Sequence, residues 1–230
     1  MPGVKTLLRS TVLLAVATGI AASPVQADAA TSQPATEGSR FTRIDQPQAA
    51  RASARTEAVE FFWYDCSHSQ QLEKPLQAWT EKHREDVDLR RVPAIWPRSR
   101  GEVTQRGHAR LYYTLERLDL VERLQTSAFR AIHSNKQDLT TEETATNWAL
   151  RQGVDPQQFR DAYRSADVQQ AVDEAAAMFV RYGINELPTV VVQGEQRTSP
   201  TQAGGVEAMP DVLDRLVQQD QQRNPRHEQH

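Results

Sequence analysis

The first part of the hydrophobic pattern predicts a strand, a helix and a second strand. An apolar run at residues 58–64, interrupted by Glu60, is typical of a short buried strand. Over residues 67–85 the apolar side chains recur on one face at helical spacing, and Pro75 inside this stretch predicts a kink. Residues 86–96 alternate in part between apolar and polar side chains, which favours a second strand.

A block with an almost wholly helical pattern follows, and then the strand pattern returns. Residues 101–182 carry apolar side chains at helical spacing. Two short strands are predicted at 187–192 and 195–198, joined by Gln193-Gly194, and a last helix at 209–218. We therefore predict an α/β layer fold with an inserted all-helical subdomain, in which a crossover joins the first strand pair and a hairpin joins the last.

The two ends of the chain lack this pattern. Lys5 and Arg9 precede an uncharged apolar stretch and then small residues, which predicts a secretory signal peptide at 1–27 rather than a retained membrane anchor. A polar leader at 28–55 and a Gln-rich tail at 220–230 are expected to be disordered. The remaining expected divisions are a first α/β half at 56–100, the helical insertion at 101–182 and a second α/β half at 183–219.

Composition and charge narrow the class of protein. Of the 230 residues, 38% are hydrophobic and 25% are charged, which is typical of a soluble globular protein with no membrane insertion once a signal peptide is removed. The net charge of −3 shows no excess of basic residues of the kind that nucleic-acid-binding proteins carry. His227 and His230 have no third ligand at a useful spacing, so no metal site is predicted.

Cys66 is the one cysteine of the sequence, so no internal disulfide can form. Export would place the chain in an oxidising compartment, the periplasm of a Gram-negative bacterium, where a lone thiol calls for a functional explanation. Cys66 follows Asp65 at the junction of the first strand and the first helix. The helix N-terminus and His68 favour the thiolate, whereas Asp65 opposes it. These polar neighbours favour a reactive thiol over the alternative, a buried apolar cysteine.

The sequence around Cys66 resembles that of the DsbA-like periplasmic thiol–disulfide oxidoreductases, which have a thioredoxin fold with a helical insertion. The resemblance covers most of residues 57–219. Two positions depart from the family pattern: Ser67 replaces a proline, and Ser69 replaces the second cysteine of the redox pair. The resemblance rests on Glu60-Phe61-Phe62-x-x-x-Cys66-x-His68, on Leu72-Glu73 and Trp79, and on Tyr182-Gly183-Ile184-x-x-Leu187-Pro188-Thr189.

The resemblance implies roles near the sulfur. It places His68 beside the sulfur, where the alternative is an ordinary surface residue of the helix. It makes Pro188 a cis-proline facing the sulfur, whereas the sequence alone also allows an ordinary proline at the start of a strand. By the same resemblance Leu187, Pro188 and Thr189 contact an extended substrate peptide.

Glu60 is an acidic residue inside an apolar run, and its burial would be costly without a partner. The resemblance implies a buried carboxylate that tunes the thiol, and Arg90 or Arg91 on the next strand is a candidate partner. The alternative is that Glu60 faces solvent on the other side of the strand.

Ser69 decides which chemistry is available. A serine hydroxyl cannot displace a mixed disulfide, so the chain cannot store an oxidising disulfide within itself. We therefore expect thiol:disulfide interchange through Cys66 alone, by mixed-disulfide exchange or isomerisation that an external thiol resolves. Ser69 is expected to donate a hydrogen bond to the Cys66 thiolate.

The expected partners are extended or unfolded polypeptides that contain cysteines. No bound cofactor is expected, and glutathione is a candidate co-substrate. Two alternatives remain open: a non-catalytic peptide-binding chaperone or adaptor, and a glutathione-dependent transferase or isomerase. Specialisation, decay and engineered replacement of the second cysteine are all compatible with Ser69.

Overall fold

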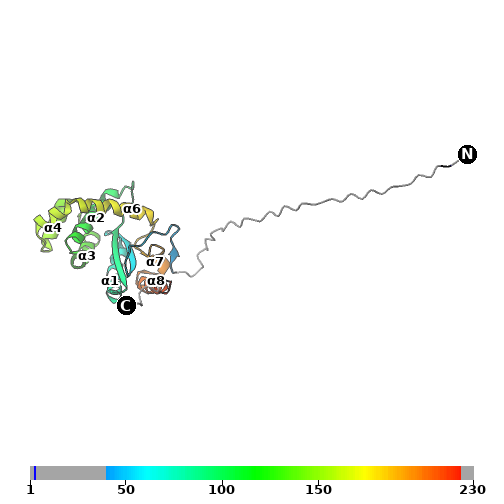
Figure 1. Ribbon diagram of the computed structural model, residues 1–230. Coiled ribbons are helices and arrows are strands. Elements are labelled where there is room, and N and C mark those ends of the chain that lie inside the picture. Colours follow the sequence, from blue (N-terminus) through cyan, green and yellow to red (C-terminus); the bar gives the residue numbers. More distant parts are fainter. Residues whose placement is uncertain (1–2, 4–39, 224–230) are drawn as a thin grey trace. The chain divides into compact units, whose positions relative to one another are not determined.

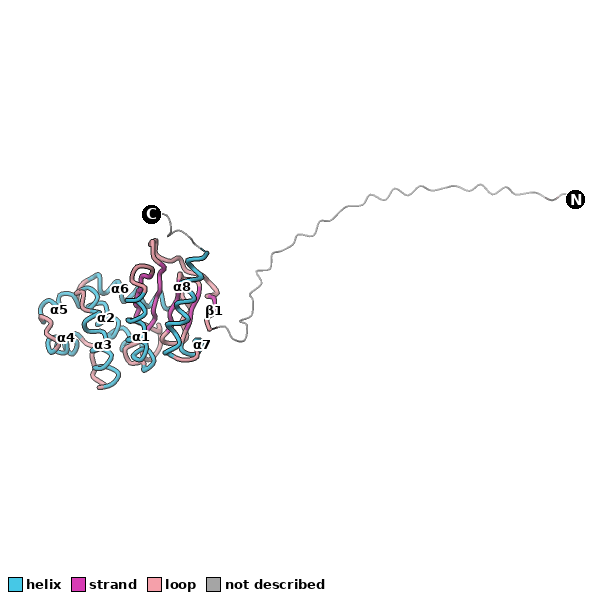
Figure 2. The backbone as a smooth tube through the Cα atoms, turned by 90° about the horizontal axis from the view of Figure 1, so that it is seen from below, coloured by secondary structure: helices cyan, strands magenta, loops and turns pink. Residues whose placement is uncertain are grey.

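The structure is a computed structural model that describes residue 3 and residues 40–223. Within this part, helices cover both faces of a mixed sheet of five strands, in the order β1-β5-β4-β2-β3 (Figures 1 and 2). The strands are β1 (Thr42–Arg43), β2 (Thr56–Phe62), β3 (Val87–Pro93), β4 (Thr189–Val192) and β5 (Gln196–Thr198).

The helices fall into three groups along the chain. One helix, α1 (Ser67–Lys82), connects β2 to β3. The helical insertion lies between β3 and β4 and consists of α2 (Glu102–Arg117), α3 (Val121–Phe129), a π-helical turn η1 (Arg130–Ser134), α4 (Glu142–Arg151), α5 (Pro156–Tyr163) and α6 (Ala166–Arg181). The last group is α7 (Pro200–Ala203), the short 3₁₀ turn η2 (Val206–Ala208) and α8 (Met209–Arg223).

The strand pairing confirms the topology expected from the sequence. Strands β2 and β3 are parallel, and β4 is antiparallel to both β2 and β5. The β4–β5 hairpin turns at Gln193 and Gly194, which both have positive φ angles, 50° and 65°. A Cβ atom at Gly194 would lie 1.9 Å from the carbonyl oxygen of Gln48, so this position requires glycine.

The strand β2, which lies between β4 and β3, is buried along its whole length and separates two apolar cores. Ala58 packs with α1 and α8 on one face of the sheet, whereas Val59 and Phe61 pack with the helical insertion on the other. Successive side chains of a strand point to opposite faces, so one apolar run supplies both cores. This explains why apolar residues occupy neighbouring positions of the strand instead of strictly alternating with polar ones.

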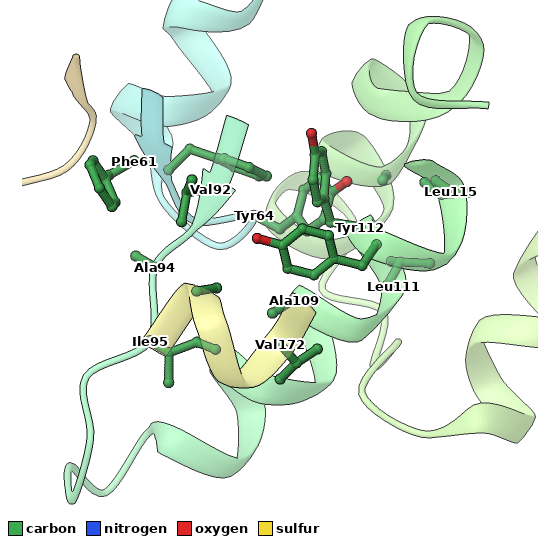
Figure 3. Close-up of a cluster of buried hydrophobic side chains, with 14 of the residues drawn as sticks. Phe61, Tyr64, Val92, Ala94, Ile95, Ala109, Leu111, Tyr112, Leu115 and Val172 are labelled. Atoms are coloured by element: carbon green, nitrogen blue, oxygen red, sulfur yellow. The ribbon is translucent and has the colours of Figure 1, made fainter. Parts of the chain in front are cut away.

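The core that faces the helical insertion joins the C-terminal end of β2 to that insertion. Figure 3 shows Phe61, Val92 and Tyr64 meeting side chains of α2 and α6, among them Tyr112 and Val172. Tyr64 is fully buried, and its hydroxyl donates a hydrogen bond to Oε1 of Gln125 on α3, at 2.6 Å. The segment between β2 and α1 is therefore anchored in the insertion.

Several details differ from the sequence prediction. The helix α1 continues through Pro75 and ends at Lys82, and β2 ends at Phe62, before the residues expected to complete it. Part of the expected leader is ordered, because β1 pairs with β5 and Ile44 is buried. The helix α8 reaches Arg223, so the expected disordered tail does not begin at residue 220.

The predicted signal peptide lies outside the described residues. None of the helices in the described part, residues 40–223, has the length and hydropathy that a membrane span requires.

Candidate active site

Cys66 occupies the N-cap position of α1. Its backbone is extended, with φ −114° and ψ 122°, and the helix begins at the next residue. The unpaired backbone N–H groups of a helix N-terminus favour a negative charge at this place. The side chain is half-buried, and its thiol donates a hydrogen bond to the carbonyl oxygen of Leu187, with Sγ and O 3.8 Å apart. The predicted nucleophile thus lies between α1 and the loop before β4.

The loop before β4 contains the expected cis-proline. The peptide bond between Leu187 and Pro188 is cis. The side chains of Leu187, Pro188 and Thr189 are buried, with exposed fractions of 9% for Leu187 and 3% for Thr189. A peptide bound here would therefore meet the backbone of the loop more than its side chains, and the peptide-binding role of these residues stays a prediction.

Glu186 ties this loop to the start of α7. Its carboxylate accepts hydrogen bonds from the hydroxyl of Ser199 at 2.7 Å and from the hydroxyl and backbone N–H of Thr201 at 2.6 and 3.2 Å. Burial alone would raise the pKa of Glu186, but the hydrogen bonds from Thr201 and Ser199 hold the pKa below its ordinary value. The hydroxyl of Thr189 donates to the carbonyl oxygen of Glu186 at 2.7 Å, which braces the loop from its other end.

Ser69 is fully buried at the position where the family pattern has the second cysteine. Its hydroxyl oxygen accepts a hydrogen bond from the backbone N–H of Trp63 at 3.3 Å. Among the described residues no hydrogen bond joins Ser69 to Cys66, whose thiol donates to Leu187 instead. Donation by Ser69 to a Cys66 thiolate stays a prediction.

Glu60 is 1% exposed, so the alternative that it faces solvent is wrong. Its partner is Arg91, which lies directly opposite on β3 and donates from Nε to Oε2 at 3.2 Å. Nη2 of Arg91 also lies 3.6 Å from Oε1 of Glu73 on α1. Burial raises the pKa of Glu60 to about 8, against the attraction of Arg91, and burial also raises the pKa of Glu73.

Asp65 faces two basic side chains from the helical insertion. Its carboxylate lies 3.0 Å from Nδ1 of His133 and accepts a hydrogen bond from Nζ of Lys136 at 2.9 Å. Burial alone would raise the pKa of Asp65, but the bonds from Lys136 and His133 hold the pKa below its ordinary value. The carboxylate is therefore kept ionised by two side chains of the insertion.

Trp63 links the turn before Cys66 to a buried histidine on α2. Its indole N–H donates to Nδ1 of His108 at 3.0 Å. His108 is 4% exposed, and burial lowers its pKa to about 4. Near neutral pH the imidazole is uncharged, with Nδ1 as the acceptor and the proton on Nε2.

The sequence identified only part of this site. Cys66, Asp65 and Ser69 lie in one turn, and Leu187 reaches the sulfur. His68 is exposed in the first turn of α1, and its charge is among the smaller causes that lower the pKa of Glu186.

The site residues that sequence reasoning missed come mostly from the helical insertion, far along the chain. No spacing in the sequence relates them to Cys66, because only the tertiary fold brings these segments together. They are His108, Gln125, His133, Lys136 and, from the loop before β4, Glu186.

Comparisons with known proteins agree with this geometry. The model of the DSBA-like thioredoxin domain matches residues 67–217, well over half of the chain. The chain is 37% identical over 213 residues to a thiol:disulfide interchange protein DsbA of Burkholderia cepacia, covering 92% of this chain and 96% of that protein. This chain belongs to the DsbA-like thioredoxin family. The predicted fold, a thioredoxin-like domain with a helical insertion, is confirmed, and so is the enzyme class of thiol–disulfide oxidoreductases at the level of the family.

Solved structures of DsbA-like proteins have the same fold. The crystal structure of DsbA from Pseudomonas aeruginosa superposes with a TM-score of 0.75 at 26% identity, covering 82% of this chain and 96% of that one. The oxidoreductase NmDsbA1 of Neisseria meningitidis has a TM-score of 0.72 at 23% identity, covering 82% and 95%, and supports the fold alone. The family is therefore established by two independent kinds of comparison, sequence and structure.

Proposed function

We propose that this DsbA-like protein carries out thiol:disulfide interchange through Cys66 alone, with an external thiol completing each cycle. The observation that carries the proposal is the pairing of a half-exposed thiol at a helix N-terminus with a buried serine at the second cysteine position. The nucleophile is in place, and Ser69 cannot form a disulfide with it.

The reaction balances without an oxidant or a reductant. The Cys66 thiolate attacks one sulfur of a substrate disulfide, a new S–S bond forms, and the other substrate sulfur leaves as a thiolate. A second thiolate then attacks the substrate sulfur of this mixed disulfide and releases Cys66 as a thiolate. When the second thiolate belongs to the same substrate, the net result is a rearranged disulfide. When it belongs to a small thiol such as glutathione, the product is a substrate–glutathione disulfide.

The proposed substrates are extended or unfolded polypeptides that contain cysteines. The curated relatives are thiol:disulfide interchange proteins by name, which supports this class of substrate. The carbonyl oxygen of Leu187 lies 3.8 Å from the sulfur, so a peptide held along the backbone of this loop would pass beside the nucleophile. The predicted signal peptide supports export to the periplasm as the place of reaction.

The test uses scrambled ribonuclease and glutathione, with recovery of ribonuclease activity as the readout. We expect the wild-type protein to speed recovery, and acid-quenched samples to contain a mixed disulfide at Cys66 by mass spectrometry. Cys66→Ala should remove both signals, whereas Ser67→Ala, a change beside the thiol, should retain them. Recovery without any adduct at Cys66 would contradict the proposal. Suppression of aggregation that survives Cys66→Ala would favour a chaperone instead.

A further inference from the structure

Two residues that flank Cys66 in the sequence are attached to the same turn of the helical insertion. Before Cys66, the Asp65 carboxylate is held by His133 of η1 at 3.0 Å and by Lys136 at 2.9 Å. After it, Nε2 of Gln70 donates to Oγ of Ser134, the last residue of η1, at 3.0 Å. The nucleophile therefore lies between two attachments to one short segment.

The backbone of this segment is unusual. Residues 130–134 form a π-helical turn, and Lys136 has a φ angle of 51°, in the left-handed region that non-glycine residues seldom adopt. Ala131 and Ile132 are buried and hold the turn in the apolar core. Unusual backbone geometry of this kind is maintained only where the surrounding packing fixes it. In this protein the unusual backbone of the segment places the ammonium group of Lys136 within hydrogen-bonding distance of Asp65.

The contact brings a basic side chain onto the carboxylate of the residue that directly precedes Cys66. A carboxylate next to a thiol opposes formation of the thiolate, and a cation favours it. A carboxylate at Asp65 would by itself oppose the Cys66 thiolate, and the ammonium group of Lys136 carries the opposite charge. The charged or titratable groups on the segments next to Cys66 are Asp65 and His68 on its own segment, Glu186 on the cis-proline loop, and His133 and Lys136 from the insertion.

We propose that His133 and Lys136 are positioning residues for the interchange reaction: they hold Asp65 and offset its charge, so that the η1 turn of the helical insertion sets how readily Cys66 becomes a thiolate. This inference rests on the proposed single-thiol function and adds to it a control of reactivity by a segment about 70 residues along the chain from the nucleophile.

The test measures the rate at which iodoacetamide, a neutral reagent, alkylates Cys66 across a range of pH at low salt. Lys136→Met leaves Asp65 less compensated, and we expect alkylation near neutral pH to slow about two- to fivefold, the scale of one partly exposed ion pair. Asp65→Asn is expected to speed alkylation by a similar factor. The double variant Asp65→Asn/Lys136→Met should return close to the wild-type rate, because both charges are removed together.

Two further variants act as controls. Lys82 also pairs with an aspartate at 2.9 Å, but at the opposite end of α1, about 24 Å from Cys66 by the rise of the helix. Lys82→Met removes the same charge from the same kind of pair, and it should leave the alkylation rate unchanged. Lys136→Arg keeps the charge and should retain the wild-type rate.

The outcomes separate this inference from the proposed function. Equal rates for wild type and Lys136→Met would overturn the inference, and so would a double variant as slow as Lys136→Met. Alkylation requires no substrate disulfide, so a protein that fails to rearrange ribonuclease still reports on the role of Lys136. Conversely, ribonuclease recovery together with equal alkylation rates for the wild type and Lys136→Met would leave the proposed function standing and remove the role of Lys136.

Discussion

The hydroxyl oxygen of Ser69 lies 3.3 Å from the backbone nitrogen of Trp63 and accepts its hydrogen bond. Ser69 is fully buried, so this hydroxyl serves the turn that precedes the nucleophile rather than an incoming substrate. Its burial also means that a side chain of similar size is enclosed by the same neighbours. Position 69 is therefore suited to a test of what the second cysteine of the family pattern would add to the chemistry of Cys66.

Ser69→Cys is expected to convert the site into a two-cysteine redox pair. The substitution exchanges an oxygen for a sulfur in the first turn of α1, three residues after Cys66, which is the spacing of Cys-x-x-Cys sites. After mild oxidation we expect both thiols to be lost together and a mass decrease of about two hydrogens, which denotes one internal disulfide. Mass spectrometry after thiol labelling measures this result.

Ser69→Ala is the matched control for this experiment. It should retain one alkylatable thiol after oxidation, and it should lower the free energy of unfolding by about 1–3 kcal/mol because the N–H of Trp63 loses its acceptor. An oxidised Ser69→Cys protein that still carries two labelled thiols would show that the two side chains cannot approach each other.

Much of the fold could be predicted from the sequence because its signals are local. The largely apolar sequence of β2 reflects burial on both faces, and the turn at Gln193-Gly194 requires positive φ angles that glycine adopts readily. The strand β1 gave no signal because it is two residues long and forms by pairing with β5, which is distant in the sequence. The helix α1 contains Pro75 and continues to Lys82, so the proline does not end it, and the kink at Pro75 stays a prediction.

In the candidate site, too, some residues could be identified from the local sequence, whereas others are brought together only by the tertiary fold. Cys66 and Pro188 could be identified because the strand–turn–helix and the loop before β4 each have a recognisable local sequence. The choice of Arg91 over Arg90 as the partner of Glu60 depends on register, because only Arg91 lies opposite Glu60. The contact between Asp65 and Lys136 joins residues 71 positions apart, and nothing in the sequence near either residue indicates it.

Glu60→Gln is expected to change the pH dependence of stability. Burial raises the pKa of Glu60 from 4.5 to about 8, so between these values the folded chain keeps a proton that the unfolded chain releases. The contribution of Glu60 to stability is therefore present below about pH 4.5 and is lost as the pH rises through about 8. Relative to the variant, the wild-type free energy of unfolding should fall by up to about 1.4 kcal/mol per pH unit in this window.

Urea unfolding at several pH values between about 5 and 8 measures the effect of Glu60. Glu85 is exposed, and Glu85→Gln should give the same slope as the wild type. Parallel curves for the wild type and Glu60→Gln would show that Glu60 is ionised in the folded chain across this range.

Glu186→Ala is expected to loosen the cis-proline loop. The carboxylate accepts three hydrogen bonds from Ser199 and Thr201, and its loss leaves these donors without their acceptor. We expect a loss of about 1–3 kcal/mol in the free energy of local opening, seen as faster amide hydrogen exchange at the loop before β4 and at the start of α7. Exchange in α4, at the far end of the insertion, should be unaffected. A uniform increase across the whole chain would instead indicate global destabilisation.

His108→Asn is expected to remove a pH dependence of the opposite sign. Burial lowers the pKa of His108 from 6.5 to about 4, so between these values the unfolded chain binds a proton that the folded chain does not. The contribution of His108 is present above about pH 6.5 and is lost as the pH falls through about 4, by up to about 1.4 kcal/mol per pH unit. Asparagine does not titrate, and its carbonyl oxygen can accept the hydrogen bond from Trp63.

The slopes from His108 and Glu60 oppose each other between pH 4.5 and 6.5, the range in which both groups distinguish the folded from the unfolded chain. The effect of His108 is therefore measured most clearly in the Glu60→Gln background, by urea unfolding at about pH 4.5, 5.5 and 6.5. In that background stability should rise with pH, and adding His108→Asn should flatten the rise. His68→Asn, which changes an exposed histidine, should leave the rise intact. If His108→Asn leaves the rise unchanged as well, His108 is protonated in the folded chain and its hydrogen bond with Trp63 must be reassigned.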